Sequence, residues 1–194
     1  MAVAILAAGR GERLGADSPK PLVTVNGRPM VAIAVDAATA SGLAPVLAVL
    51  GHEAGAVRGA VPSGVEVVVA PDWELGISAS LRAALDALEA RPEVDAVCVG
   101  LADQPRVGPG SYRRLAAARA EGATLAVATY GGRRGNPVLL GREIWVEARR
   151  LGGDVGARAL FRTHAVVEVE CGDTGRPDDV DTLEDRDRLE GWET

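Results

Sequence analysis

Lysine, cysteine and aromatic residues are scarce in this sequence. Lys20 is the only lysine among 21 basic residues, there are two cysteines, and aromatic residues make up 3% of the chain. With so few aromatics, the core has to be built from Ala, Val and Leu. Cys98 and Cys171 lie far apart in apolar stretches without CxxC spacing, which favours structural thiols in a reducing compartment. A lone lysine draws attention because its compact charge suits a crowded phosphate better than a wider guanidinium group does.

The chain also lacks a surplus of basic residues and a long apolar run. Its formal net charge is −6, which argues against nucleic-acid binding and against binding to an anionic membrane surface. An anionic small-molecule substrate would instead need a local cluster of cations. The apolar N-terminal run ends at Gly9 with no basic residue before it, too short for a signal peptide or a spanning helix. We therefore expect a cytoplasmic protein.

Strand-like and helix-like segments alternate along the chain. Its 194 residues, 47% of them apolar, suffice for one domain with a sizeable core, and no repeat or long linker divides them. Short apolar runs predict strands at 3–8, 45–50, 65–70, 94–101, 124–130 and 165–169. Amphipathic spacing predicts helices at 29–41, 54–60, 78–90, 110–121, 142–150, 156–163 and 182–191. We expect residues 131–137 to form a loop or hairpin inserted over the sheet.

This alternation predicts an α/β protein of three layers, α/β/α. Its sheet should be mostly parallel and covered by helices on both faces. Ligands of such sheets bind beyond the carboxyl ends of the strands. The residues that directly follow predicted strands are therefore the first candidates for function.

The first motif follows the strand predicted at 3–8. It combines three glycines with three cations: Gly9, Gly11, Gly15, Arg10, Arg13 and Lys20. Glycines let backbone amides approach phosphate oxygens closely, and the cations neutralise triphosphate charge. Leu14 breaks a GxGxxG pattern and no Gly-Lys-Ser/Thr follows, so the segment is neither a dinucleotide fingerprint nor a Walker A loop. The alternative is a plain joint between strand, turn and helix.

Two acidic motifs are candidates for a metal site. Asp103 follows the strand predicted at 94–101, where its carboxylate would hold Mg²⁺ (or Mn²⁺) against phosphate oxygens. Alternatively, Asp103 only caps the turn before Pro105. Asp179 and Asp181 precede the last predicted helix, and one of them would complete the metal site. The alternative is that this segment simply caps that helix.

Several segments, in order, resemble the MobA-like nucleotidyltransferases, and especially the cytidylyltransferases that mature molybdenum cofactor. They are the opening at 6–15 with Lys20, and then 26–30, 71–81, 101–105, 134–138, 153–158 and 179–182. The resemblance implies a Rossmann-like nucleotidyltransferase fold with a mixed, mostly parallel sheet. It also implies that a nucleoside monophosphate passes from an NTP to a phosphorylated small-molecule acceptor, with a molybdoenzyme as a further partner.

The resemblance also assigns roles to single residues. Asp103 matches the family's metal-binding aspartate, and Asp181 matches an aspartate of its terminal D-[IV]-D-T motif, which favours it over Asp179. The expected catalytic residues are Arg13, Lys20 and Asp103. The expected nucleotide-binding residues are Leu6, Ala7, Ala8, Gly9, Arg10, Gly11, Arg13, Lys20, Asp72, Gly76, Ser78 and Ser80. The expected acceptor-binding residues are Arg134, Asn136 and Arg158, with Asn136 in the place of a family histidine.

The choice of nucleotide rests on Ala8. This residue completes the LAAG of cytidine-using members, where guanosine users have LAGG, and its Cβ would narrow the base pocket in favour of a pyrimidine. CTP is therefore the expected substrate and molybdopterin the expected acceptor. Since Ile77 and Asn136 depart from the family pattern, a sugar phosphate, phospholactate or another phosphorylated alcohol also stays open.

The expected reaction is in-line attack of an acceptor phosphate oxygen on the α-phosphorus of the NTP, with release of pyrophosphate. The nucleophile is already an anion, so the site needs positive charge rather than a general base, and Arg13 and Lys20 would stabilise the pyrophosphate. The rival hypothesis is a non-catalytic chaperone that binds a nucleotide or cofactor. An oxidoreductase that uses a dinucleotide is disfavoured because GxGxxG is absent and position 36 lies inside the first predicted helix.

Overall fold

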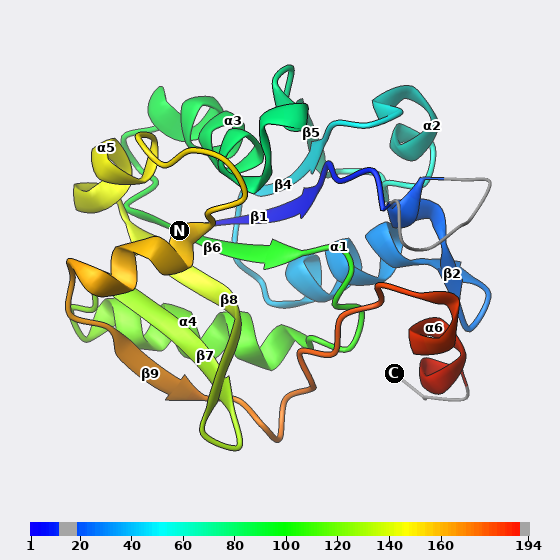
Figure 1. Cartoon of the computed structure of the whole chain (residues 1–194). Helices are drawn as coiled ribbons and strands as arrows, with labels where there is room; N and C mark the ends of the chain where they lie inside the picture. Colours follow the sequence, from blue (N-terminus) through cyan, green and yellow to red (C-terminus); the bar gives the residue numbers. More distant parts are fainter. Residues whose placement is uncertain (12–18, 191–194) are drawn as a thin grey trace.

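The computed structural model describes residues 1–11 and 19–190 of the chain. Its main strands are β1 Ala2–Ala7, β4 Val46–Leu50, β5 Glu66–Val69, β6 Ala96–Leu101, β7 Leu125–Tyr130, β8 Arg133–Gly141 and β9 Val167–Glu170. They form one sheet of seven strands in the order β5-β4-β1-β6-β8-β7-β9 (Figure 1). β8 runs antiparallel to both of its neighbours, and every other neighbouring pair is parallel. The predicted mixed, mostly parallel sheet is confirmed.

Helices cover both faces of this sheet. They are α1 Met30–Ala40, α2 Ala54–Arg58, α3 Ile77–Glu89, α4 Pro109–Ala120, α5 Trp145–Ala148 and α6 Leu183–Leu189. Four short 3-10 segments accompany them within the described residues: η2 Lys20–Leu22, η3 Trp73–Leu75, η4 Arg142–Ile144 and η5 Ala157–Arg162. α3 and α5 pack on one face and α1 and α4 on the other (Figure 1), which confirms the three-layer class.

The central strand β1 explains why both faces are covered. Its even-numbered residues join the core under α3, and its odd-numbered residues join the core under α1 and α4. None of its residues is more than 7% exposed. A strand that is apolar on both faces has no polar alternation, which is the pattern of buried parallel strands.

The segment predicted to lie over the sheet is instead part of it. Gly131 and Gly132, both with positive φ, form the tip of a hairpin, and β8 enters the plane of the sheet between β6 and β7. The expectation of a hairpin is right, and its placement over the sheet is wrong. The start of β8 is polar and rich in glycine, as a loop would be. Its buried end lacks the alternation of polar and apolar residues that identifies a half-buried strand. Only the pairing with β6, which is distant in sequence, identifies the strand.

Other differences concern short elements. The helix predicted at 142–150 is η4 followed by the single turn of α5, and the helix predicted at 156–163 is the 3-10 segment η5. An additional hairpin joins β2 Thr24–Val25 to β3 Arg28–Pro29. Its turn is Asn26-Gly27, with positive φ at both residues, as a two-residue hairpin turn prefers. No helix within the described residues has both the length and the apolar character needed to cross a membrane.

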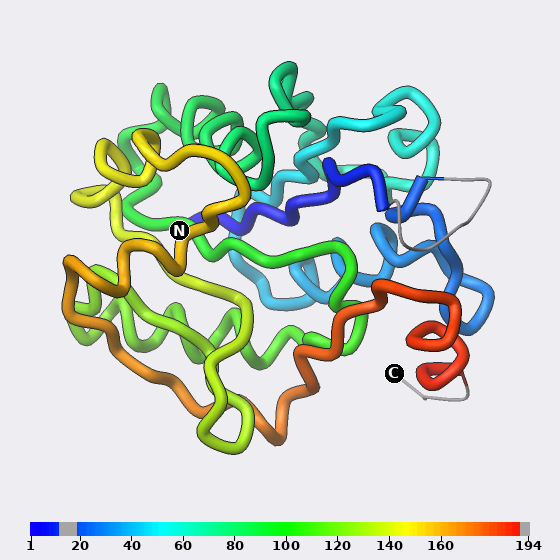
Figure 2. Tube along the Cα trace, viewed as in Figure 1, coloured from blue at the N-terminus to red at the C-terminus, as the bar shows by residue number. Residues whose placement is uncertain are grey.

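After β9 the chain returns past the carboxyl end of β6 (Figure 2). A bridge between Val107 and Gly175 ties the two segments together, and the amide of Val180 donates to the carbonyl of Asp103 at 2.9 Å. Val180 is fully buried in a third apolar cluster with residues of β2 and α6. This return carries the acidic segment 178–181 back to the strand ends.

Leu139→Ala tests the position of β8. Leu139 is fully buried and stands opposite Cys98 of β6 and Ala126 of β7, so its truncation leaves a cavity in the middle of the sheet. We expect the free energy of unfolding, measured by urea denaturation, to fall by about 2–5 kcal/mol. Val146→Ala is the control, since that side chain is 59% exposed. Equal stability of the two variants would contradict the central placement.

Candidate active site at the carboxyl ends of β1 and β6

The carboxyl ends of β1 and β6 lie side by side at the centre of the sheet. Leu6 is in register with Leu101, and the amide of Ala102 donates to the carbonyl of Leu6 at 3.0 Å. A cavity of about 640 Å³ opens beyond these two ends. Its volume is in the range of small-molecule sites, and its place is where open α/β sheets bind ligands.

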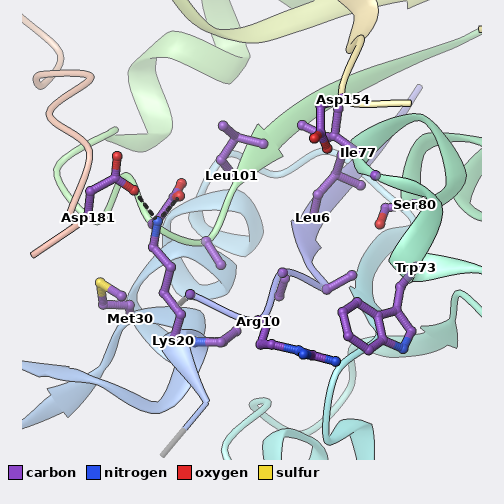
Figure 3. Close-up of a pocket in the computed structure, with 18 of the residues that line it drawn as sticks. Leu6, Arg10, Lys20, Met30, Trp73, Ile77, Ser80, Leu101, Asp154 and Asp181 are labelled. Carbon is purple, nitrogen blue, oxygen red and sulfur yellow. Dashed lines mark hydrogen bonds and ion pairs between the residues drawn. The ribbon is translucent and has the colours of Figure 1, made fainter. Parts of the chain in front are cut away.

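Three charged side chains meet in this cavity (Figure 3). Lys20 Nζ donates to Oδ2 of Asp103 at 2.6 Å and to Oδ1 of Asp181 at 2.8 Å. Lys20 comes from η2, Asp103 from the turn after β6, and Asp181 from the segment before α6. The Lys20 side chain is 13% exposed, whereas those of Asp103 and Asp181 are 26% and 35% exposed, so the cation is more shielded from water than its two partners.

The pKa of Lys20 reflects two opposing effects. Burial lowers the pKa of the ammonium group, but the carboxylates of Asp103 and Asp181 raise it, and the net shift is upward. Lys20 therefore stays protonated at neutral pH. The sequence predicts that Lys20 faces the leaving pyrophosphate. In the structure its ammonium group lies between Asp103 and Asp181, the two residues predicted to bind the metal ion.

The two carboxylates also fit a divalent cation. Oδ1 of Asp103 is buried and has no hydrogen-bond partner among the described residues, so this oxygen is available as a ligand. Mg²⁺ takes oxygen ligands and is usually held by one or two carboxylates, with water and substrate phosphate completing its shell. Residues 1–11 and 19–190 contain no cluster of three or more metal-binding side chains. Asp103 and Asp181 would thus be the protein's contribution.

Asp179 belongs to a neighbouring polar network rather than to this ion pair. It accepts a hydrogen bond from Nε2 of Gln104 at 2.8 Å, and Oε1 of Gln104 accepts one from Nδ2 of Asn136 at 3.1 Å. Burial, together with the nearby carboxylates of Asp103 and Asp181, raises the pKa of Asp179. The helix cap is provided by Thr182, which forms a capping box with Asp185. This division leaves the side chain of Asp181 directed at Lys20.

Most of the residues predicted to bind the nucleotide line the cavity. They are Leu6, Ala7, Ala8, Gly9, Arg10, Gly11, Lys20, Gly76 and Ser80. Arg13 lies outside the described residues.

Asp72 and Ser78 do not line the cavity, and their role in nucleotide binding stays a prediction. Asp72 is an exposed residue that begins η3, and Ser78 is 2% exposed in the first turn of α3. Gly76 meets a different constraint: it has a φ of +98°, and an added Cβ would lie 2.5 Å from the backbone carbon of Gly153. Segment 153–154 therefore closes over the start of α3.

Trp73, which belongs to the resembling segment 71–81 but had no role of its own assigned, forms a wall of the site. It lines the cavity, the Arg10 guanidinium lies 5.4 Å from its ring centroid, and the His52 ring lies 5.1 Å away. A Cβ on Gly51 would come within 2.5 Å of the Trp73 Cβ, so the glycine lets the indole approach. The scarcity of aromatic residues is the sequence signal that singles out Trp73. Its position in the site follows only from the tertiary contacts.

Two further cavities continue from the first. One of about 250 Å³ shares Leu6, Ile77, Leu101 and Asp154 with it, and one of about 470 Å³ lies beyond. Of the residues predicted to bind the acceptor, Asn136 lines the smaller of the two, Arg134 the larger, and Arg158 both. Arg134 is already paired with Glu168 at 2.7 Å, and the amide of Asn136 is engaged by Gln104. Arg158 is exposed and joins the two spaces.

Lys20→Met tests the shared ion pair. Methionine keeps the apolar stem but removes the charge, so Asp103 and Asp181 would face each other without a counter-ion. We expect the free energy of unfolding, measured by urea denaturation, to fall by about 1–3 kcal/mol. Mn²⁺ should restore part of this loss, since a divalent cation can take the place of the ammonium group. Arg58→Met, on the exposed face of α2, is the control; equal responses of both variants to Mn²⁺ would contradict the arrangement.

Comparison with known proteins agrees with this geometry. The profile of the MobA-like NTP transferase domain matches residues 3–169. The chain is 32% identical to nicotine blue oxidoreductase from Paenarthrobacter nicotinovorans, over 95% of this chain and 94% of that protein.

Solved structures share the whole fold. Rv0371c from Mycobacterium tuberculosis H37Rv superposes with a TM-score of 0.84 at 34% identity, covering 97% of this chain and 95% of that one. Rv0371c in complex with manganese superposes with a TM-score of 0.81 at 32% identity, covering 97% and 96%. The profile match spans most of the chain and the relatives span nearly all of it. The chain therefore belongs to the MobA-like NTP transferase family and is a nucleotidyltransferase of that family.

Proposed function

We propose that this nucleotidyltransferase transfers CMP from CTP to the phosphate group of a small-molecule acceptor of the molybdopterin type, with release of pyrophosphate. The observation that carries the proposal is the convergence of Lys20, Asp103 and Asp181 in the cavity beyond β1 and β6. Two carboxylates around one cation, beside a glycine-rich loop, suit the binding of a triphosphate with its counter-ion.

Different residues of the chain would bind the phosphates and the metal ion. Backbone amides of the loop after β1 would cradle the phosphates, and Arg10 and Lys20 would neutralise them. Mg²⁺ or Mn²⁺, held by Asp103 and Asp181, would supply positive charge at the α-phosphate. The acceptor's phosphate oxygen forms the new bond to the α-phosphorus, and the bond to the bridging oxygen breaks, so that pyrophosphate leaves with the electron pair. No side chain has to remove a proton from an acceptor that is already an anion.

Ala8 supports the choice of a pyrimidine. It is 5% exposed, lines the cavity next to Gly9, and its Cβ lies 2.7 Å from where a Cβ on Gly51 would be. The two small residues thus leave little spare room on this side, and the methyl group of Ala8 would narrow a base pocket there in favour of a pyrimidine.

A second candidate is oxidoreductase activity, because the Paenarthrobacter relative carries that name. Two observations favour transfer instead. Asp36, at the position where a dinucleotide site would place an acid for the ribose, lies inside α1 and is paired with Arg28. The loop after β1 lacks the GxGxxG spacing of dinucleotide sites and leads instead to Lys20 and its two carboxylates.

Asp103→Asn tests the proposed reaction. Pyrophosphate release is measured with each of the four NTPs, Mg²⁺ and molybdopterin. We expect release with CTP, and a fall of about 10²–10³ in turnover in the variant, because one oxygen ligand and one charge are lost from the reacting centre. Asp173→Asn, which alters an exposed carboxylate paired with Arg114, is the matched control and should keep full turnover.

The other outcomes separate the rival functions. Nucleotide binding without pyrophosphate release for any acceptor would support a chaperone that hands on a cofactor. Oxidation of a nicotinamide cofactor without pyrophosphate release would support the oxidoreductase. Full turnover of the Asp103 variant would remove the proposed metal site.

Ala8→Gly tests the choice of nucleotide. Removing the methyl group widens the base pocket, so kcat/KM for GTP relative to CTP should rise about tenfold, the scale of one methyl group in a fitted pocket. Steady-state kinetics with both nucleotides measures this ratio. An unchanged ratio would show that position 8 does not select the base.

A further inference from the structure

We propose that the acceptor carries a second anionic group, distant from the phosphate that reacts, and that Arg133, Arg158 and Arg176 bind it in the cavity of about 470 Å³. This inference rests on the proposed function, because it assumes that the reacting phosphate lies near Asp103. It narrows the acceptor to a class of molecules with two anionic ends.

Three unpaired guanidinium groups line this cavity. Arg133, Arg158 and Arg176 come from the start of β8, from η5 and from the return segment after β9, and all three are exposed. Within residues 1–11 and 19–190, none of their side chains forms a hydrogen bond or salt bridge, whereas other wall residues are paired as described below. Because these guanidinium groups have no protein partner, they are available to bind an anionic group in the cavity.

The other charged residues of the wall already have partners. Arg134 pairs with Glu168, Asp178 pairs with Arg106 at 3.2 Å, and Asp179 accepts from Gln104. Asp179 keeps its negative charge, because its partner Gln104 is neutral. The three unpaired guanidinium groups outnumber this carboxylate, so the balance of charge on the wall is positive. Guanidinium groups present forked donors that match carboxylate and phosphate oxygens.

This cavity is continuous with the site of transfer. It shares Gln104, Arg158 and Asp179 with the cavity of about 250 Å³, which in turn shares four residues with the cavity that holds Lys20. The middle cavity has Leu81, Val99 and Val138 as apolar lining residues. Its charged lining residues, Asp154, Arg158 and Asp179, are ones that it shares with the cavities on either side. An elongated molecule with an uncharged middle and two anionic ends fits this series of spaces.

Arg133 and Arg176 belong to a different cavity from the residues that surround the reacting phosphate. Asp103, Asp181 and Lys20 line the first cavity only, and Arg133 and Arg176 line the third only. The first and third cavities share no lining residue, so these arginines are assigned to a different anion. This explains why Asn136, which replaces a family histidine, need not be charged: the cations lie further out.

The experiment compares two probes that differ by one phosphate group. Isothermal titration measures the dissociation constants of fructose 1,6-bisphosphate and fructose 6-phosphate, with α,β-methylene-CTP and Mg²⁺ filling the nucleotide site. We expect the bisphosphate to bind at least about tenfold more tightly, the change that one charge-assisted hydrogen bond produces. Arg133→Gln and Arg176→Gln should each remove most of this advantage and leave the affinity for the monophosphate unchanged.

Arg58→Gln is the matched control, since it removes an exposed cation on α2, away from the three cavities, and should leave the advantage intact. Thermal melting checks that all variants are folded. Equal affinities for the two probes, or equal losses in the control and the pocket variants, would overturn the inference. Because titration needs no turnover, a protein that prefers the bisphosphate through these arginines but releases no pyrophosphate would refute the proposed transfer alone.

Discussion

The ammonium group of Lys20 holds together two carboxylates that lie 83 and 161 positions further along the chain. This shared ion pair joins the loop after β1, the turn after β6 and the segment before α6. Burial alone would lower the pKa of the ammonium group, and the two carboxylates outweigh that effect. The site is therefore charged and preorganised at the place where the proposed function puts a triphosphate and a divalent cation.

The sheet makes this meeting possible. Since β1 and β6 are parallel neighbours, the residues that follow them emerge at the same edge, and the return of the chain after β9 brings Asp181 to that edge as well. Helices cover both faces of the sheet. Backbone amides and polar side chains can therefore face a ligand at the edge where the strands end. Three cavities follow one another from there, and their character changes from mixed charge through apolar to cationic.

Family membership and chemistry are separate conclusions here. A relative named as an oxidoreductase and a nucleotidyltransferase profile both match most of the chain, so the fold alone does not choose a reaction. The choice rests on side chains: the lysine between two acids, the small residues at Ala8 and Gly51, and the arginines of the outer cavity. The lysine and the arginines suit phosphate or another anion, and the small residues bear on the choice of base, which is consistent with transfer chemistry.

The sequence alone determined the layer class and most strands and helices, and it singled out the glycine-rich segment after β1, because continuous apolar runs, helical spacing and glycines beside cations are local signals. It also pointed to Asp103 and Asp181 through motif resemblance. Only the tertiary structure placed β8 inside the sheet, put Lys20 between the two carboxylates, and separated Asp179 from Asp181. It also turned Ser78 inward and gathered Arg133, Arg158 and Arg176 around one cavity. The physical reason is that strand pairing, burial and ion pairing bring together residues that are distant in sequence. A local sequence pattern does not show which distant residues come together.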